Sequence, residues 1–178
     1  MPLLLPHQVA AILANADAAV TNDAKGKAFE DLVCCIFATV PGITVARRNQ
    51  IGAYAAEEID VAFWNDQFDD GLYFLPNILL VECKNWSDRL GSEHVAWFDA
   101  KLRARGHDIG ILVAANGITG DPARASAAQH VVSNALGEGR KIIVITRTEL
   151  SALADTPALI NLIKGKLCEL AVDGSLVL

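Results

Sequence analysis

The fold is decided by two apolar stretches with a short polar segment between them, EEIDVAFWND at residues 57–66 and NILLVECKNW at residues 77–86. Both are predicted to be strands, because each carries a short apolar run of strand length. Side chains alternate between the two faces of a strand, so Glu82 and Lys84 project from the same face. If the first stretch forms the neighbouring strand, Asp60 joins them, and two carboxylates and one ammonium converge on a single place.

The register of the first strand favours Asp60 as the acidic partner. Ile59, Val61 and Phe63 form one apolar face, which leaves Asp60 on the other face. The two glutamates that precede Ile59 are alternatives, although either can equally be a solvated turn carboxylate. A simpler interpretation of the Glu-x-Lys triplet is an exposed salt bridge, which stabilises a protein by at most ~1 kcal/mol.

Such a cluster is costly within strands that are otherwise built from Ile, Leu and Val. Carboxylate oxygens hold Mg²⁺ at ~2.0–2.1 Å, with waters completing the octahedron, and a neighbouring lysine can orient or deprotonate the attacking water. The cluster therefore predicts an enzyme that cleaves phosphodiester bonds with a divalent ion. Because two like charges converge, Asp60→Asn and Glu82→Gln are both expected to leave the metal-free protein at least as stable as the parent.

This arrangement resembles the active site of the PD-(D/E)xK nuclease superfamily. Asp60 matches the acid of the family's first motif strand, and Glu82-x-Lys84 matches its second half-motif. The VECKNW run of the second strand and ILVAANGITG at residues 111–120 are most similar to Mrr-type restriction endonuclease domains, and the ECKNW run is also similar to nuclease-related NERD domains. The resemblance covers about residues 24–146.

The resemblance implies a Mg²⁺-dependent nuclease in which Mn²⁺ can substitute. It implies that Asp60, Glu82 and the main-chain carbonyl of Cys83 hold the metal, while Lys84 positions the attacking water and stabilises charge on the phosphate. The family often adds an acidic residue from the preceding helix. Glu30, at the margin of the apolar face of that predicted helix, is the fourth candidate; the alternative is a carboxylate at the flank of the helix with no part in the site.

Length and composition predict one globular domain over residues 1–178, since 52% of the 178 residues are hydrophobic. The four cysteines show no metal-ligand spacing and are expected to be reduced, which predicts a cytoplasmic protein. The apolar N-terminal stretch lacks a positively charged start and is interrupted at Pro6, so no signal peptide is expected. No run reaches the ~18 apolar residues of a membrane span, so no membrane partner is expected.

The net charge of −6 and the pI near 5.1 are unusual for an enzyme that binds nucleic acid, because phosphate affinity normally comes from Lys and Arg. DNA is the expected substrate and RNA the alternative, with weak intrinsic affinity. A homodimer or a partner protein is therefore expected to supply part of the binding. The candidate phosphate contacts, each of which can equally be a solvated surface charge, are Arg47, Arg48, Arg89, Lys101, Arg103 and Arg105.

The order of predicted elements indicates an α/β fold, a three-layer α/β/α sandwich with a central mixed sheet of the restriction endonuclease-like type. The sheet is expected to be antiparallel at the motif hairpin and parallel later, where the strands are apolar throughout. Helices are predicted at 8–20, 24–39, 92–105, from about 122, and as two short helices within 149–169. Strands are predicted at 43–48, 58–64, 77–84, 109–115 and 141–146, with a candidate terminal strand at 174–178.

The signature motifs of nucleotide hydrolysis, zinc proteolysis and serine hydrolysis are missing from the sequence. His94 has two interpretations, a contact to substrate phosphate or a half-exposed structural histidine. Two functional classes remain: a metal-dependent nuclease in a defence or repair context, and a non-catalytic subunit of the same fold that binds nucleic acid or protein. The presence of all three motif residues favours the nuclease.

Overall fold

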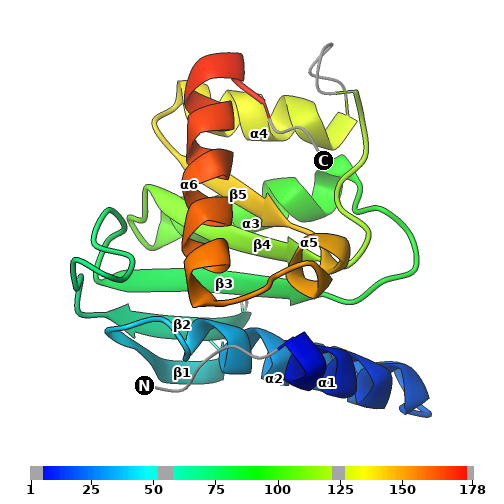
Figure 1. Cartoon of the computed structure of the whole chain (residues 1–178). Coiled ribbons are helices and arrows are strands. Elements are labelled where there is room, and N and C mark those ends of the chain that lie inside the picture. The colour runs from blue at the N-terminus through cyan, green and yellow to red at the C-terminus, as the bar shows by residue number, and fades with distance from the viewer. Residues whose placement is uncertain (1–5, 52–57, 122–126, 176–178) are drawn as a thin grey trace.

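A mixed five-stranded sheet forms the centre of the computed structural model, which describes residues 6–51, 58–121 and 127–175 (Figure 1). In chain order the strands are β1 (Ile43–Ile51), β2 (Glu58–Asn65), β3 (Ile78–Lys84), β4 (Ile109–Ala114) and β5 (Lys141–Ile145). Their order in the sheet is the same as in the chain. β2 is antiparallel to both of its neighbours, β1 and β3, whereas β3, β4 and β5 are parallel.

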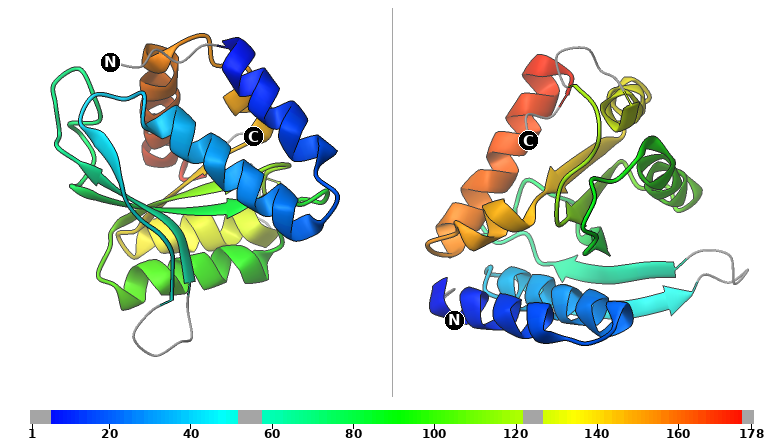
Figure 2. Two further views of the ribbon diagram at one scale, coloured as in Figure 1. Left: turned by 90° about the horizontal axis from the view of Figure 1, so that it is seen from below. Right: turned by 90° about the vertical axis from the view of Figure 1, so that its right-hand side faces the viewer.

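Helices cover both faces of the sheet, as the two views of Figure 2 show. Two helices that connect parallel strands lie on one face, and the remaining helices lie on the other. The first group is α3 (Ser92–Ala104) and α4 (Ala127–Gly137); the second is α1 (Pro6–Ala18), α2 (Asn22–Phe37), α5 (Arg147–Ser151) and α6 (Thr156–Asp173). No helix among the described residues is long and apolar enough to cross a membrane.

The packing of α2 decides which way the side chains of β2 point. Thr21 caps this helix by accepting a hydrogen bond from the main-chain N–H of Ala24 at 3.2 Å. At the other end of the helix the ring of Phe37 stacks on Phe63 of β2, with 5.1 Å between ring centroids. Because side chains alternate along a strand, Asp60 must then point to the opposite face, toward α3.

Close packing of α3 on β4 brings that helix over the centre of the sheet. A Cβ added to Gly110 of β4 would lie 2.7 Å from side-chain atoms of both Leu102 and Phe98, so a larger residue would displace these two buried side chains. β4 is buried along its whole length, as expected for a parallel strand with helices on both faces. The buried face of α3 is thereby held directly over β3 and β4.

The predicted α/β architecture, a mixed sheet between two helical layers, is confirmed. The last two helices differ in length from the expectation of two short ones, because α5 has 5 residues whereas α6 has 18. Gly174 adopts a left-handed conformation (φ 68°) that ends α6, so the predicted strand does not begin there, and residues 176–178 lie outside the described residues. The predicted start of α4 near residue 122 also lies outside them.

Candidate active site

The site lies where β2 separates from β3. The ladder between these strands ends at the pair Val61 and Val81, although β2 continues to pair with β1 as far as Ile51 and Glu58. If the ladder continued by one more residue pair, Asp60 would lie opposite Glu82. The fork therefore opens at the two predicted acidic residues.

At this fork the side chain of Asp60 takes the place of the missing backbone hydrogen bonds to β3. Its Oδ2 accepts a hydrogen bond of 2.7 Å from the main-chain N–H of Cys83, a buried group that would otherwise lack a partner on this side. The N–H and C=O of one strand residue point to the same side, so the Cys83 carbonyl also faces the opening. The carbonyl of Lys84, one residue further, points the other way and accepts from Ala115 at 2.9 Å.

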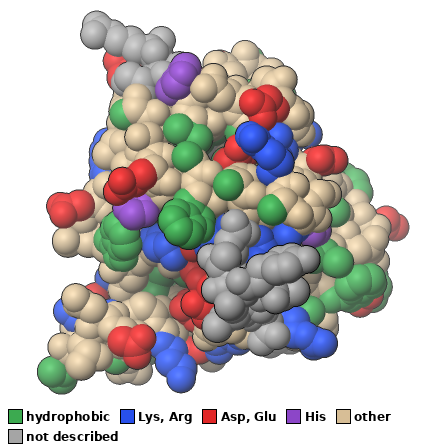
Figure 3. All heavy atoms as spheres, turned by 180° about the vertical axis from the view of Figure 1, so that it is seen from behind, with side chains coloured by type: hydrophobic (Ala, Val, Ile, Leu, Met, Phe, Trp, Pro, Cys, Tyr) green, Lys and Arg blue, Asp and Glu red, His purple; other side chains and the backbone are tan. Residues whose placement is uncertain are grey.

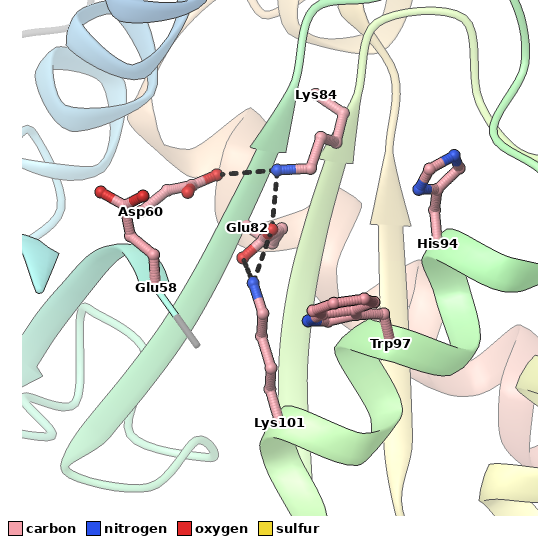
Figure 4. Close-up of a pocket in the computed structure, with 7 residues that line it drawn as sticks. All are labelled: Glu58, Asp60, Glu82, Lys84, His94, Trp97 and Lys101. Carbon is pink, nitrogen blue, oxygen red and sulfur yellow. Dashed lines mark hydrogen bonds and ion pairs between the residues drawn. The ribbon is translucent and has the colours of Figure 1, made fainter. Parts of the chain in front are cut away.

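The structure brings together the three side chains that the sequence singled out (Figure 4). The Nζ of Lys84 lies 2.7 Å from Oε1 of Glu82 and 3.5 Å from Oδ2 of Asp60. Asp60 and Glu82 are 8% and 5% exposed, respectively, so these charges are largely removed from water. The lysine ammonium occupies the place between two carboxylates that a cation would favour.

A second lysine, Lys101 of α3, was not among the predicted site residues but contacts the site directly. Its Nζ donates to Oε1 and Oε2 of Glu82 at 2.9 and 2.8 Å, and the residue is only 5% exposed. The sequence carried a signal for this position. Lys101 follows Phe98 by three residues, which puts it on the buried face of the helix beside Leu102 rather than on the solvent face.

Charge and burial shift the proton affinity of two residues of the cluster. Burial raises the pKa of Asp60, and repulsion by Glu82 adds to the shift, while Lys84 and the Cys83 N–H partly oppose it. Burial disfavours the charged form of Lys84, but the carboxylates of Glu82 and Asp60 outweigh this and raise the pKa of Lys84 above its usual value. Lys84 is therefore an ammonium at neutral pH and not a free base.

These side chains form the floor of a pocket of about 280 Å³. Besides the residues named above, the pocket is lined by Glu58 of β2 and by His94 and Trp97 of α3. Figure 4 shows the α3 residues on the side of the pocket opposite Asp60. On the face of the molecule that α3 and α4 cover, shown in Figure 3, acidic and basic side chains lie next to hydrophobic and histidine side chains.

Glu30 lies beside this pocket and not inside it. It lines a neighbouring cavity together with Asp60 and Glu58, and its Oε2 is 3.5 Å from a guanidinium nitrogen of Arg48. Burial raises the pKa of Glu30, and repulsion by Asp60 adds to the shift, which places the two carboxylates within electrostatic reach. Glu30 is thus the predicted site residue that does not join Asp60, Glu82 and Lys84 at the floor of the pocket.

The donor atoms at the fork suit a hard divalent cation. Asp60 and Glu82 supply carboxylate oxygens and Cys83 a carbonyl oxygen facing the same opening, and Mg²⁺ is commonly held by one or two carboxylates with waters. The Cys83 side chain points to the opposite face of β3 from Glu82 and Lys84, so its thiol does not face the pocket, and burial raises its pKa well above the usual value. Among the described residues, no group of three or more His, Cys, Asp or Glu side chains could hold a metal by itself.

Two of the six basic residues proposed as phosphate contacts have acidic partners away from the pocket. Arg48 pairs with Asp31 at 2.6 Å, and Arg103 pairs with Asp99 at 3.1 Å and with Glu138 at 2.9 Å. Of the six candidates only Lys101 lines the pocket, and it binds Glu82. The positive charge available to a phosphate near the site is therefore small.

The comparison with known families agrees with this geometry. Residues 21–154, which include all five strands, match the Mrr-type catalytic-domain model that is described as a restriction endonuclease. No curated protein matches the chain.

Proposed function

Since the chain belongs to the Mrr-type restriction endonuclease family, a family of nucleases, we propose that it is a divalent-metal-dependent nuclease that hydrolyses phosphodiester bonds in DNA. One observation carries the proposal: the Lys84 ammonium joins the carboxylates of Asp60 and Glu82 at the floor of a pocket. We also propose that residues 1–178 form one nuclease domain, because α2 and α6, from opposite ends of the chain, pack on the same sheet.

Asp60, Glu82 and the carbonyl of Cys83 would hold the metal, with Mg²⁺ as the proposed ion and Mn²⁺ as a substitute. Bound there, such an ion supplies Lewis-acid polarisation of the phosphoryl group and a water of lowered pKa. The two carboxylates are held in place before any ligand arrives, Asp60 by the Cys83 N–H and Glu82 by the Lys101 ammonium. This preorganisation lowers the cost of assembling the site.

Lys84 is proposed to act as a cation. Its raised pKa keeps it protonated, so it donates hydrogen bonds to the attacking water and to phosphate oxygens and stabilises the negative charge that develops there. Lys101 holds Glu82 from the side of α3, and each lysine gains a further anionic partner when a phosphate enters. Glu30, whose own pKa is raised by burial and by repulsion from Asp60, is proposed to supply an additional carboxylate from the neighbouring cavity.

DNA is the proposed substrate and RNA the alternative, and a homodimer or a partner protein is proposed to supply further contacts. The pocket lining contains three carboxylates, Glu58, Asp60 and Glu82, against the two ammonium groups of Lys84 and Lys101. With this balance, affinity from phosphate contacts alone is weak.

A second candidate function is a subunit that binds nucleic acid or protein without cleaving it. It is favoured by one observation, that Lys101 already engages both oxygens of Glu82 and so satisfies this carboxylate within the protein. Buried ion pairs of this kind can serve the fold alone.

A nicking assay decides between the two. We expect purified protein to nick plasmid DNA with Mg²⁺ or Mn²⁺ and not in EDTA, and we expect Lys84→Ala to lower the rate by about 10²–10³-fold, the usual effect of losing one donor to developing charge. Lys164→Ala is the matched control, because Lys164 lies on α6 over the rings of Tyr73 and Phe74. Absence of cleavage of DNA and RNA with either ion would favour the binding subunit.

A further inference from the structure

Two exposed tryptophans lie beside the candidate site. The side chain of Trp97, on α3, is 59% exposed and lines the pocket that contains Asp60, Glu82 and Lys84. Trp86, just beyond the end of β3, is 46% exposed and lines an adjoining pocket that shares Lys84. Large indole surfaces in water are unfavourable, and two of them at one polar site indicate a surface that is covered by a ligand.

His94 connects the two indoles. Its ring lies edge-on to Trp86 with 4.5 Å between centroids, and it lines the same pocket as Trp97, one helical turn away on α3. Figure 4 shows His94 and Trp97 projecting from consecutive turns of α3 on one side of the pocket. The three rings thus follow one another along one edge of the site, from one pocket into the next.

The backbone that presents these rings is held firmly. The side chain of Asn116 donates to the main-chain carbonyls of Trp86 and Ser87 at 2.6 and 3.1 Å. The same loop is tied again at Leu90, which pairs with the segment at Ile118. Aromatic groups on ordered segments bind a ligand without a further cost of ordering the chain.

We propose that Trp97, His94 and Trp86 are a stacking platform for unpaired nucleobases and that a single-stranded nucleic acid is the preferred substrate. Stacking on aromatic side chains holds bases without regard to sequence, and it does not require the positive charge that this pocket lacks. A duplex covers both faces of each base with its neighbours, so its bases cannot reach the rings unless they are unstacked. The proposal deepens the nuclease function above and rests on that site being the place where nucleic acid binds.

The test measures binding in EDTA, where cleavage cannot interfere. The probes are a fluorescein-labelled oligothymidylate, the corresponding oligouridylate, and a hairpin duplex with the same number of phosphates, read by fluorescence anisotropy. We expect the parent protein to bind the single strands at least about fivefold more tightly than the hairpin, and Trp97→Ala to remove about fivefold or more of that affinity. The loss should persist as salt is raised, because stacking is not an ionic contact.

Two variants serve as controls. Trp97→Phe keeps an aromatic ring and should retain most of the affinity. Trp64→Ala removes another exposed tryptophan, which lies on β2 outside both pockets, is 44% exposed and donates its indole N–H to Asp66; this variant should bind as the parent does.

The outcomes separate this proposal from the nuclease function. Tighter binding of the hairpin than of the single strands, or unchanged binding by Trp97→Ala, would overturn the platform even if the protein cuts DNA with Mn²⁺. Trp97-dependent binding of single strands without any cleavage would support the platform and refute the nuclease function. The two single-stranded probes, compared with each other, then show whether the sugar matters.

Discussion

Glu82→Gln is the substitution whose effect on stability tests the site most sharply. Glu82 is 5% exposed and accepts hydrogen bonds from Lys101 at 2.9 and 2.8 Å, with Lys84 at 2.7 Å. A glutamine removes the charge that both ammonium groups share, and its NH₂ group cannot accept a hydrogen bond. Lys101, at 5% exposure, cannot turn to water without moving α3. The expectation from sequence alone, that relief of repulsion leaves this variant at least as stable, is therefore reversed.

The size of the effect follows from the cost of breaking a buried ion pair. Removing one partner of such a pair costs about 3–5 kcal/mol. We expect the lower part of this range, because the Lys84 side chain is 26% exposed and can be solvated. For a chain of this length, ~1 kcal/mol changes Tm by ~2–4 °C, so Glu82→Gln should lower Tm by roughly 6–12 °C.

The assay is thermal unfolding in EDTA, followed by circular dichroism. The double variant Glu82→Gln/Lys101→Met should recover part of the lost stability, because methionine removes the unpaired ammonium and keeps an unbranched side chain. A Glu82→Gln protein that melts at or above the parent, or a double variant that melts below Glu82→Gln, would refute this reasoning. Nicking by Glu82→Gln well below its Tm would show that the carboxylate serves the fold and not the chemistry.

Three further predictions concern the same cluster. Asp60→Asn should have a Tm in EDTA at or above that of the parent. Because the pKa of Asp60 is raised, its ionised form destabilises the fold at higher pH, so the difference in Tm should disappear as pH falls below the ordinary carboxyl range. Thermal melts from acid to neutral pH measure this difference. Lys84→Ala should still bind Mn²⁺ by calorimetry while losing cleavage. Mg²⁺ should raise the Tm of the parent in differential scanning fluorimetry and should not raise that of Asp60→Asn.

The sequence predicted the strands and the motif well because the relevant signals are local. The alternation of Ile59, Val61 and Phe63 against Asp60 is a property of one strand, and the same strand pattern holds in the sheet. The unbroken apolar runs of β4 and β5 likewise predicted parallel strands under two helical layers. The alternation of side chains along a strand can be recognised without knowing how the rest of the chain folds.

Long-range pairing is what the sequence could not supply. Lys101 was assigned to solvent and phosphate, although helical spacing placed it beside Leu102, because its partner Glu82 lies 19 residues earlier on a different element. Arg48 was assigned to phosphate for the same reason, and it pairs with Asp31 of α2. A charged residue on a predicted apolar face is better explained by a buried partner than by solvent.

The fork between β2 and β3 connects the fold to the proposed chemistry. A sheet strand that leaves its neighbour exposes main-chain groups, and Asp60 satisfies one of them, the N–H of Cys83, at 2.7 Å. The Cys83 carbonyl points to the same side as this N–H, and the separation of the strands leaves room for a ligand there. Asp60 therefore has two tasks, as an acceptor for the backbone and as a charge. Asparagine preserves the first and removes the second, whereas alanine removes both and leaves a buried N–H unpaired at a cost of about 1–3 kcal/mol. If Asp60→Ala melts well below Asp60→Asn while neither variant cleaves, Asp60 is needed both as the acceptor for the Cys83 N–H and as a charge for the reaction.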